Sequence, residues 1–308
     1  MSSRSVRIRE VGPRDGIQSE RAQVATADKV RLIDALSETG LGLIEVVSFV
    51  SPKAVPQMAD AREVWAGISR NPDVFYSALV PNRRGAEIAA ECGVDGMQVF
   101  VAATDSYNLR NVGKRVEESM ADVTDVVALA SAAGIPVEAT VSTAFGCPYE
   151  GDVHPERVVE VSRWITDRGI TTISYGDTTG MGTPRRVREV VRALRSSLPE
   201  LVLNMHFHDT RGTGLANVVA ALDEGIDYFD ASIGGMGGSP FAAGATGNVA
   251  TEDLVHMLED MEIHTGVDLN RLLAAAQLAQ ELIAGDLPGK VLRAGPRSAV
   301  TGPVGHGR

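Results

Sequence analysis

The amino-acid sequence predicts an α/β protein folded as a (β/α)8 TIM barrel with extra helices after the last strand. Short runs rich in β-branched and aromatic residues alternate with longer segments of helical period, eight times along the 308 residues. Eight strand-then-helix units favour closure of a parallel sheet into a barrel. The competing open, doubly wound sheet normally carries a glycine fingerprint in its first strand-to-helix turn, and here that turn, Gly12–Gly16, lacks it.

The predicted elements follow one another in a regular order. Strands are expected at Val6–Val11, Leu43–Val47, Phe75–Leu79, Met97–Val101, Val137–Ser142, Thr171–Tyr175, Val202–Phe207 and Tyr228–Ser232. Helices are expected at Ala27–Glu38, Pro56–Ile68, Arg83–Glu91, Arg115–Ala133, Pro155–Arg168, Pro184–Leu198, Thr213–Glu224, Glu252–Glu262 and Leu269–Ile283. Helix starts are indicated by Thr26, and by His154 and Thr183, which each precede a proline at the first helical position.

Composition indicates a folded protein with a large core, because 44% of the residues are hydrophobic and 22% are charged. We expect one barrel domain over residues 1–290. The remaining residues, 291–308, are rich in Gly, Pro and Arg and are expected to form a mobile tail or to lie on the surface.

The charge pattern argues against polyanionic partners. The 29 Lys and Arg residues against 40 Asp and Glu give a net charge of -11, and the basic residues are scattered singly. We therefore expect no nucleic acid and no anionic membrane among the partners. No segment resembles a signal peptide, a transit peptide or a spanning helix. The two cysteines, Cys92 and Cys147, are too few for a disulfide scaffold and fit a reducing, cytoplasmic setting.

Polar residues gather where the predicted strands end, which is where barrel enzymes carry their catalytic side chains. Strand one ends in Arg14 and Asp15. The second strand carries Glu45 and ends near Ser48. The other strand ends and the segment after strand eight add Asp177, His206, His208, Asn248 and Glu252.

The histidine pair is the sharpest of these signals. His206 and His208 are two residues apart on a strand, so they point to the same face and can share one metal ion. With Asp15 and the amide oxygen of Asn248 they make a mixed nitrogen and oxygen set suited to Mg2+ or Mn2+, with zinc as second choice. The competing interpretation is one packed histidine and one that caps the following helix.

The buried carboxylates can be interpreted in two ways as well. Glu45 lies inside an apolar run, so it is expected inside the barrel, where it needs a cationic partner, and Arg14 is the candidate. Arg14 and Asp15 are equally consistent with a structural ion pair at the barrel mouth. Asp177 is consistent with a site residue or with a cap of the helix that starts near Pro184.

The segment Gly234–Pro240 is unusually rich in glycine, which loses much conformational entropy on ordering. It is consistent with a lid over a substrate or with a disordered surface loop. It lacks the Gly-Lys-Ser/Thr ending of a P-loop, and the chain has no Gly-x-Ser-x-Gly elbow. Phosphate cradling and serine hydrolysis are therefore disfavoured.

Several long motifs together closely resemble the 3-hydroxy-3-methylglutaryl-CoA lyase family of the DRE-TIM metallolyase superfamily. They are Glu10–Gln18, Leu43–Pro52, Phe145–Gly151, His206–Gly212 and Gly244–Asp253. The resemblance extends from the first strand to about Lys290.

The resemblance implies that Asp15, His206, His208 and Asn248 hold Mg2+ or Mn2+. By position, it also implies that Arg14 stabilises the enolate at the thioester and that Asp15, Glu45, Asp177 and His206 take part in catalysis. Four further residues would support the acyl-CoA substrate or the loop: Gln18, Ser48, Asn111 and Glu252. The implied reaction is a retro-Claisen cleavage into acetyl-CoA and acetoacetate, as in leucine degradation. The resemblance further implies a homodimer.

One residue departs from the family pattern. In the lyases a cysteine of the glycine loop is linked to proton transfer, and this chain has Ser239 there. A hydroxyl is a much weaker acid than a thiol of pKa about 8.5, so the resemblance implies that Ser239 is a catalytic residue that relays a proton through water, or that the substrate differs. The departure keeps open a lyase for another tertiary 3-hydroxyacyl-CoA, such as citramalyl-CoA or a longer 3-substituted glutaryl-CoA. A Claisen-type synthase or aldolase of the same superfamily and a catalytically silent, metal-binding relative are two further hypotheses.

Overall fold

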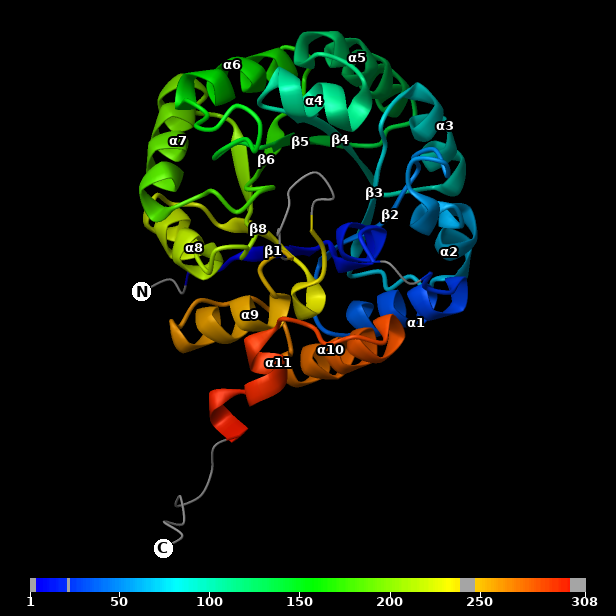
Figure 1. Ribbon diagram of the computed structural model, residues 1–308. Coiled ribbons are helices and arrows are strands. Elements are labelled where there is room, and N and C mark those ends of the chain that lie inside the picture. Colours follow the sequence, from blue (N-terminus) through cyan, green and yellow to red (C-terminus); the bar gives the residue numbers. More distant parts are fainter. Residues whose placement is uncertain (1–3, 21–22, 239–246, 300–308) are drawn as a thin grey trace, which may run out of the picture.

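The computed structural model describes residues 4–20, 23–238 and 247–299. Eight parallel strands form a closed barrel in chain order, with β1 hydrogen-bonded to both β2 and β8 (Figure 1). Their bounds are β1 Arg7–Glu10, β2 Leu43–Ser48, β3 Phe75–Leu79, β4 Gly96–Ala102, β5 Val137–Ser142, β6 Thr172–Gly176, β7 Val202–His206 and β8 Tyr228–Ala231. The predicted (β/α)8 fold is confirmed, and an open sheet is excluded by the closure between β1 and β8.

Helices surround the strands as an outer ring (Figure 1). Their bounds are α1 Thr26–Ser37, α2 Ala61–Gly67, α3 Arg83–Cys92, α4 Asp105–Val112, α5 Val116–Ala132, α6 Pro155–Thr166, α7 Pro184–Ser197, α8 Gly214–Asp223, α9 Thr251–Asp260, α10 Leu269–Ile283 and α11 Lys290–Ala294. Single turns of other helix types occur at η1 Gly12–Gly16, η2 Pro56–Met58, η3 Ile233–Gly235 and η4 Arg297–Ala299.

Most predicted elements match within one or two residues, and three differences stand out. The segment predicted as one helix, Pro56–Ile68, consists of η2 and then α2. Helices α4 and α11 were not predicted. Of the expected helix starts, Thr183 caps α7 by accepting a hydrogen bond from Arg186 N, whereas His154 makes no side-chain cap and Thr26 is already the first residue of α1.

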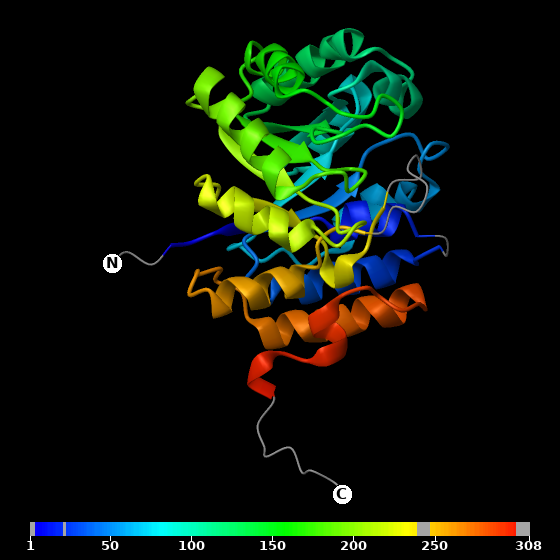
Figure 2. The same ribbon diagram turned by 60° about the vertical axis from the view of Figure 1, so that its left-hand side comes forward.

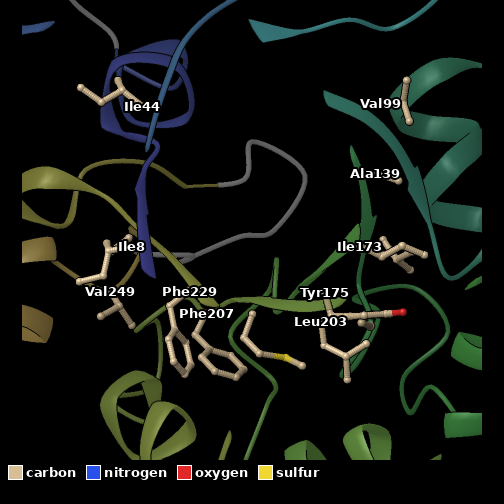
Figure 3. Packing of buried hydrophobic residues seen from close by; sticks show 14 of the residues in the cluster. Ile8, Ile44, Val99, Ala139, Ile173, Tyr175, Leu203, Phe207, Phe229 and Val249 are labelled. Carbon is tan, nitrogen blue, oxygen red and sulfur yellow. The ribbon is translucent and has the colours of Figure 1, made fainter. Parts of the chain in front are cut away.

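Along most strands, residues that point into the barrel are polar and those that point outward are apolar. Side chains that point outward pack against the helices and form the hydrophobic core, as Figure 3 shows for Ile8, Ile44, Val99, Ile173, Leu203 and Phe229. The intervening residues include Arg9, Glu45, Gln98, Ser174, Asn204 and Asp230, all buried. Since residues that alternate along a strand face opposite sides, the interior of this barrel is largely polar, and its apolar core lies between strands and helices.

The extra C-terminal helices lie together on one side of the barrel (Figure 2). Helix α10 packs against α1 and α9, and α11 packs against α9. The carboxylate of Asp253 accepts hydrogen bonds from the first N–H groups of α11, at Lys290 (3.0 Å) and Val291 (2.7 Å). The predicted tail therefore begins with an ordered turn on α9, and residues 300–308 lie outside the described part. Among the described helices, none is both long and apolar enough to span a membrane.

Candidate functional site

Three side chains from the carboxyl ends of β1 and β7 converge in a buried cluster. Ligand atoms of Asp15, His206 and His208 all lie within 4.8 Å of one another. The Nε2 atoms of the two histidines are 3.2 Å apart, so both rings present the same nitrogen to the cluster. As the candidate site of a divalent ion, we call these three residues the metal centre. Their juxtaposition matches the prediction from the spacing of the two histidines.

The atoms present suit a divalent cation. Two nitrogens bound about 2.1 Å from one ion at a right angle lie about 3.0 Å apart, close to the observed separation of the histidines. Asn248 lies beside the centre and donates from Nδ2 to Asp15 Oδ2 (2.8 Å) and to the carbonyl of Met236 (3.0 Å). Its Oδ1 is buried without a hydrogen-bond partner in the described part of the chain, so an acceptor is left for a ligand.

Arg14 is held by two carboxylates. It donates from Nε and Nη2 to the two oxygens of Glu45 (2.9 and 3.0 Å), and from Nη1 to Asp15 Oδ1 (2.6 Å). The predicted pairing of Glu45 with Arg14 is confirmed. Burial by itself would raise the pKa of Asp15, but the Arg14 guanidinium and the two imidazoles outweigh it and hold that pKa below its ordinary value. Asp15 is therefore ionised and available to a cation.

His206 has a second carboxylate on its other side. Its Nδ1 lies 3.1 Å from Asp230 Oδ2. Burial would lower the pKa of His206, but the hydrogen bond and the charge of Asp230 raise it overall. Asp230 was not among the predicted site residues. The available signal was an acidic residue inside the apolar run of β8, the same signal that singled out Glu45 in β2.

Asp177 follows β6 next to His206, whose carbonyl accepts from the Asp177 N–H (2.8 Å). One carboxylate oxygen accepts from Gly182 N (2.8 Å), in the loop before α7. The side chain that caps α7 is that of Thr183, not that of Asp177. The other carboxylate oxygen of Asp177, Oδ2, is buried with no hydrogen-bond partner within residues 4–20, 23–238 and 247–299. Burial raises the pKa of Asp177 to about 7, only partly offset by the backbone N–H groups of Gly182 and Met181.

Two further buried carboxylates hold the base of the glycine segment. Glu252 accepts from Gly234 N (2.9 Å), and Glu10 accepts from Ile233 N (2.8 Å). Burial raises the pKa of each to about 7. Gly237 approaches the metal centre so closely that a Cβ there would be 2.5 Å from Asn248 Nδ2, and its φ is +109°. Only glycine fits that approach. Glu10 was not among the predicted site residues either.

The remaining candidates are placed differently. Gln18 donates to Asp15 Oδ1 (3.1 Å), so it adjoins the metal centre. Ser48 ends β2, buried, with its hydroxyl unpartnered in the described chain. Asn111 is exposed on the last turn of α4, and within the described residues no hydrogen bond joins it to the other candidates. Ser239 lies outside the described residues.

Comparisons with known proteins agree with this arrangement. The sequence profile of the HMGL-like family matches residues 5–279. A hydroxymethylglutaryl-CoA lyase of Bacillus subtilis is 47% identical over 290 residues, covering 94% of this chain and 97% of that protein. A 3-hydroxy-3-isohexenylglutaryl-CoA/hydroxy-methylglutaryl-CoA lyase of Pseudomonas aeruginosa is 47% identical over 274 residues, covering 89% and 91%.

A solved structure is similar over nearly the whole fold. An HMG-CoA lyase from Acinetobacter baumannii, in complex with coenzyme A and 3-methylmalate, is 39% identical, with a TM-score of 0.93 and coverage of 98% of this chain and 99% of that chain. The family match includes the strands and loops that carry the metal centre and Arg14. The protein is therefore an enzyme of the HMGL-like family, in the DRE-TIM metallolyase superfamily, related to the hydroxymethylglutaryl-CoA lyases.

Proposed function

We propose that this enzyme is a divalent-metal-dependent carbon–carbon lyase that cleaves 3-hydroxy-3-methylglutaryl-CoA into acetyl-CoA and acetoacetate. The observation that carries the proposal is the convergence of Asp15, His206 and His208 directly beside Arg14. Relatives covering about nine-tenths of the chain or more carry this activity in their names. These names do not favour a lyase restricted to another tertiary 3-hydroxyacyl-CoA.

In the proposed reaction the substrate's tertiary 3-hydroxyl loses its proton, and its oxygen becomes the ketone of acetoacetate as the C2–C3 bond breaks. The electron pair of that bond passes to the thioester as an enolate, and a proton added at C2 completes acetyl-CoA. Mg2+ or Mn2+ held by the metal centre, with Asn248 as an oxygen donor, would supply Lewis acidity toward the substrate oxygens.

The chain's own groups have distinct parts in this scheme. Glu45 holds the Arg14 guanidinium in place by two parallel hydrogen bonds. The remaining N–H groups of Arg14 are therefore already oriented to stabilise negative charge that develops near Asp15. Asp177 is suited to hold or release the proton on Oδ2, because its pKa of about 7 lies near neutral pH. Gly237 packs against Asn248 and Asp15 with no room for a side chain, which keeps this part of the glycine segment close to the metal centre.

The test is acetyl-CoA release by purified protein with Mg2+ or Mn2+ and 3-hydroxy-3-methylglutaryl-CoA, with citramalyl-CoA and a longer 3-substituted glutaryl-CoA in parallel. We expect cleavage of the first substrate, loss of activity with EDTA, and recovery on adding metal. A His208→Gln variant is expected to bind Mn2+ about 100-fold more weakly and to lose activity, with His154→Gln as the matched control. Preference for either other substrate would overturn the substrate assignment.

Ser239 is tested in the same assay. If serine at this position is sufficient for proton transfer, Ser239→Cys changes kcat by less than about tenfold. A larger gain would show that the serine limits the reaction on this substrate.

Assembly and cellular context belong to the proposal as well. We propose a homodimer in the cytoplasm with a place in leucine degradation, on the family resemblance and the cysteine content alone. Sedimentation of the purified protein tests the dimer.

A further inference from the structure

The carboxylate of Asp230 lies beside His206 of the metal centre, inside the barrel. Its Oδ1 accepts from Arg9 Nε (2.9 Å) and Asn204 Nδ2 (2.7 Å), and its Oδ2 accepts from Arg9 Nη2 (3.0 Å) and Ser174 Oγ (3.0 Å). His206 Nδ1 lies 3.1 Å from the same Oδ2. Asp230 and Arg9 are 5% and 2% exposed, so these bonds are shielded from water.

These contacts determine which nitrogen of His206 carries the proton. The Arg9 guanidinium and the Asn204 amide nitrogen can only donate, so Asp230 is the acceptor in each of those bonds. A carboxylate engaged in this way can pair with His206 only if Nδ1 donates. A neutral imidazole has a single N–H, so Nε2 then keeps its lone pair, and Nε2 is the atom that faces His208.

The backbone makes this arrangement rigid. His206 on β7 and Asp230 on β8 are register partners, and Arg9 on β1 is the register partner of Asp230. Three adjacent strands therefore align the guanidinium, the carboxylate and the imidazole in one row. Arg9 also bonds Glu138 on β5 across the barrel (2.7 Å), which fixes its direction. Second-row partners of this kind orient metal-binding histidines in proteins generally.

We propose that Asp230 is a positioning residue, held by Arg9, that keeps the His206 proton on Nδ1 and so presents the Nε2 lone pair to the metal centre. The inference deepens the proposed function, because the metal centre itself belongs to that proposal. Asp230 touches neither substrate nor metal, and its effect is transmitted through the imidazole.

The first measurement is the tautomer of His206 in metal-free wild type, by long-range proton–nitrogen NMR of 15N-histidine-labelled protein near pH 8. We expect the Nδ1–H form, with the resonance identified by its absence in His206→Gln. A proton on Nε2 would overturn the proposal without recourse to any variant. This readout uses neither metal nor substrate, so it stands even if the proposed lyase activity fails.

The second measurement compares Asp230→Asn with Ser174→Ala by Mn2+ titration, followed by EPR. The alanine variant is the matched control, since it removes one donor from the same carboxylate oxygen and leaves His206 untouched. Asp230→Asn is expected to populate both tautomers and to weaken Mn2+ binding by about 10- to 100-fold, whereas Ser174→Ala changes affinity by less than about threefold.

Two results would overturn the role of Asp230: unchanged tautomer and Mn2+ affinity in folded Asp230→Asn, or equal losses in both variants. If Asp230→Asn does not fold, the tautomer of His206 measured in wild type tests the proposal by itself. If wild type binds no Mn2+ at all, the proposed metal site is wrong, and the tautomer measurement still reports separately on Asp230.

Discussion

The barrel interior contains two polar layers with the same charges and different hydrogen bonding. The lower layer has Arg9 with Asp230 and Glu138, and the upper layer has Arg14 with Asp15 and Glu45. In each, one guanidinium bonds two carboxylates. Both arginines are buried, and the carboxylates around each raise its pKa although burial opposes the charge.

The layers differ in the side chains that lie beside the ion pairs. Asp230 accepts bonds at both of its oxygens, and Glu138 accepts from Arg9 and from Gln98 Nε2 (2.9 Å). Beside both layers some buried oxygens have no partner among the described residues: Gln98 Oε1 and Asn204 Oδ1 below, and Asn248 Oδ1 and Ser48 Oγ above. Within the described residues, only the upper layer brings ligand atoms of an aspartate and two histidines within 4.8 Å of one another. We therefore interpret the lower layer, whose two carboxylates are paired, as structural, and the upper layer as the one that would hold the proposed metal ion.

The largest expected effect comes from breaking the upper layer with Asp15→Asn. An amide cannot supply the anionic ligand, so we expect Mn2+ affinity to fall more than about 100-fold, with a comparable loss of cleavage. The melting temperature of the metal-free protein should change little, because Glu45 still pairs Arg14. EPR titration and thermal unfolding measure the two quantities. A large loss of stability would instead assign the upper layer a structural role.

Disrupting the lower layer with Arg9→Met is expected to lower the stability of the protein, unlike Asp15→Asn. The change leaves Asp230 and Glu138 without their cation, and removing one partner of a buried ion pair typically costs about 3–5 kcal/mol of unfolding free energy. Arg7→Met is the control at the exposed start of the same strand. Urea unfolding of both variants checks this prediction, which fails if the two lose similar stability.

Glu10, which belongs to neither layer, is expected to make the stability of the protein depend on pH. Its pKa is raised from 4.5 to about 7, so its contribution to stability is complete below about pH 4.5 and is lost as the pH rises through 7. In Glu10→Gln the amide oxygen can still accept from Gly12 N and Ile233 N, and its NH2 can donate to Thr251 Oγ1.

Relative to wild type, Glu10→Gln should therefore gain about 2–3 kcal/mol of unfolding free energy between pH 5 and pH 8. Urea unfolding at a series of pH values in that window measures the difference. If the unfolding free energies of the two proteins changed with pH in parallel, the pKa of Glu10 would not be raised in the folded protein.

The smallest effect is expected from the surface ion pair between Lys290 of α11 and Asp209, which follows His208. The Lys290 side chain is 59% exposed, so Lys290→Met should change the unfolding free energy by less than about 1 kcal/mol and leave cleavage nearly unchanged. Steady-state kinetics and urea unfolding check both. A marked fall in kcat would extend the functional region from the upper layer to α11.

The sequence predicts the strands and most helices because their periodicity is local. The sequence does not predict helix α4, because its residues Asp105, Ser106 and Asn108 are weak helix formers. It is stabilised instead by tertiary contacts. Fully buried Asn108 accepts from Ala102 N (2.9 Å) and donates to Ser119 Oγ (2.8 Å) on α5.

The candidate site divides in the same way. By itself the sequence determined the barrel, the pairing of His206 with His208 on one strand face and the need of Glu45 for a cation, because each follows from spacing or from burial of a charge within one short segment. Only the tertiary structure decided that Asp230 and Arg9 lie in one row with His206, because that depends on the register of β1, β7 and β8. Register joins residues more than 200 positions apart in the chain, where no local pattern records it.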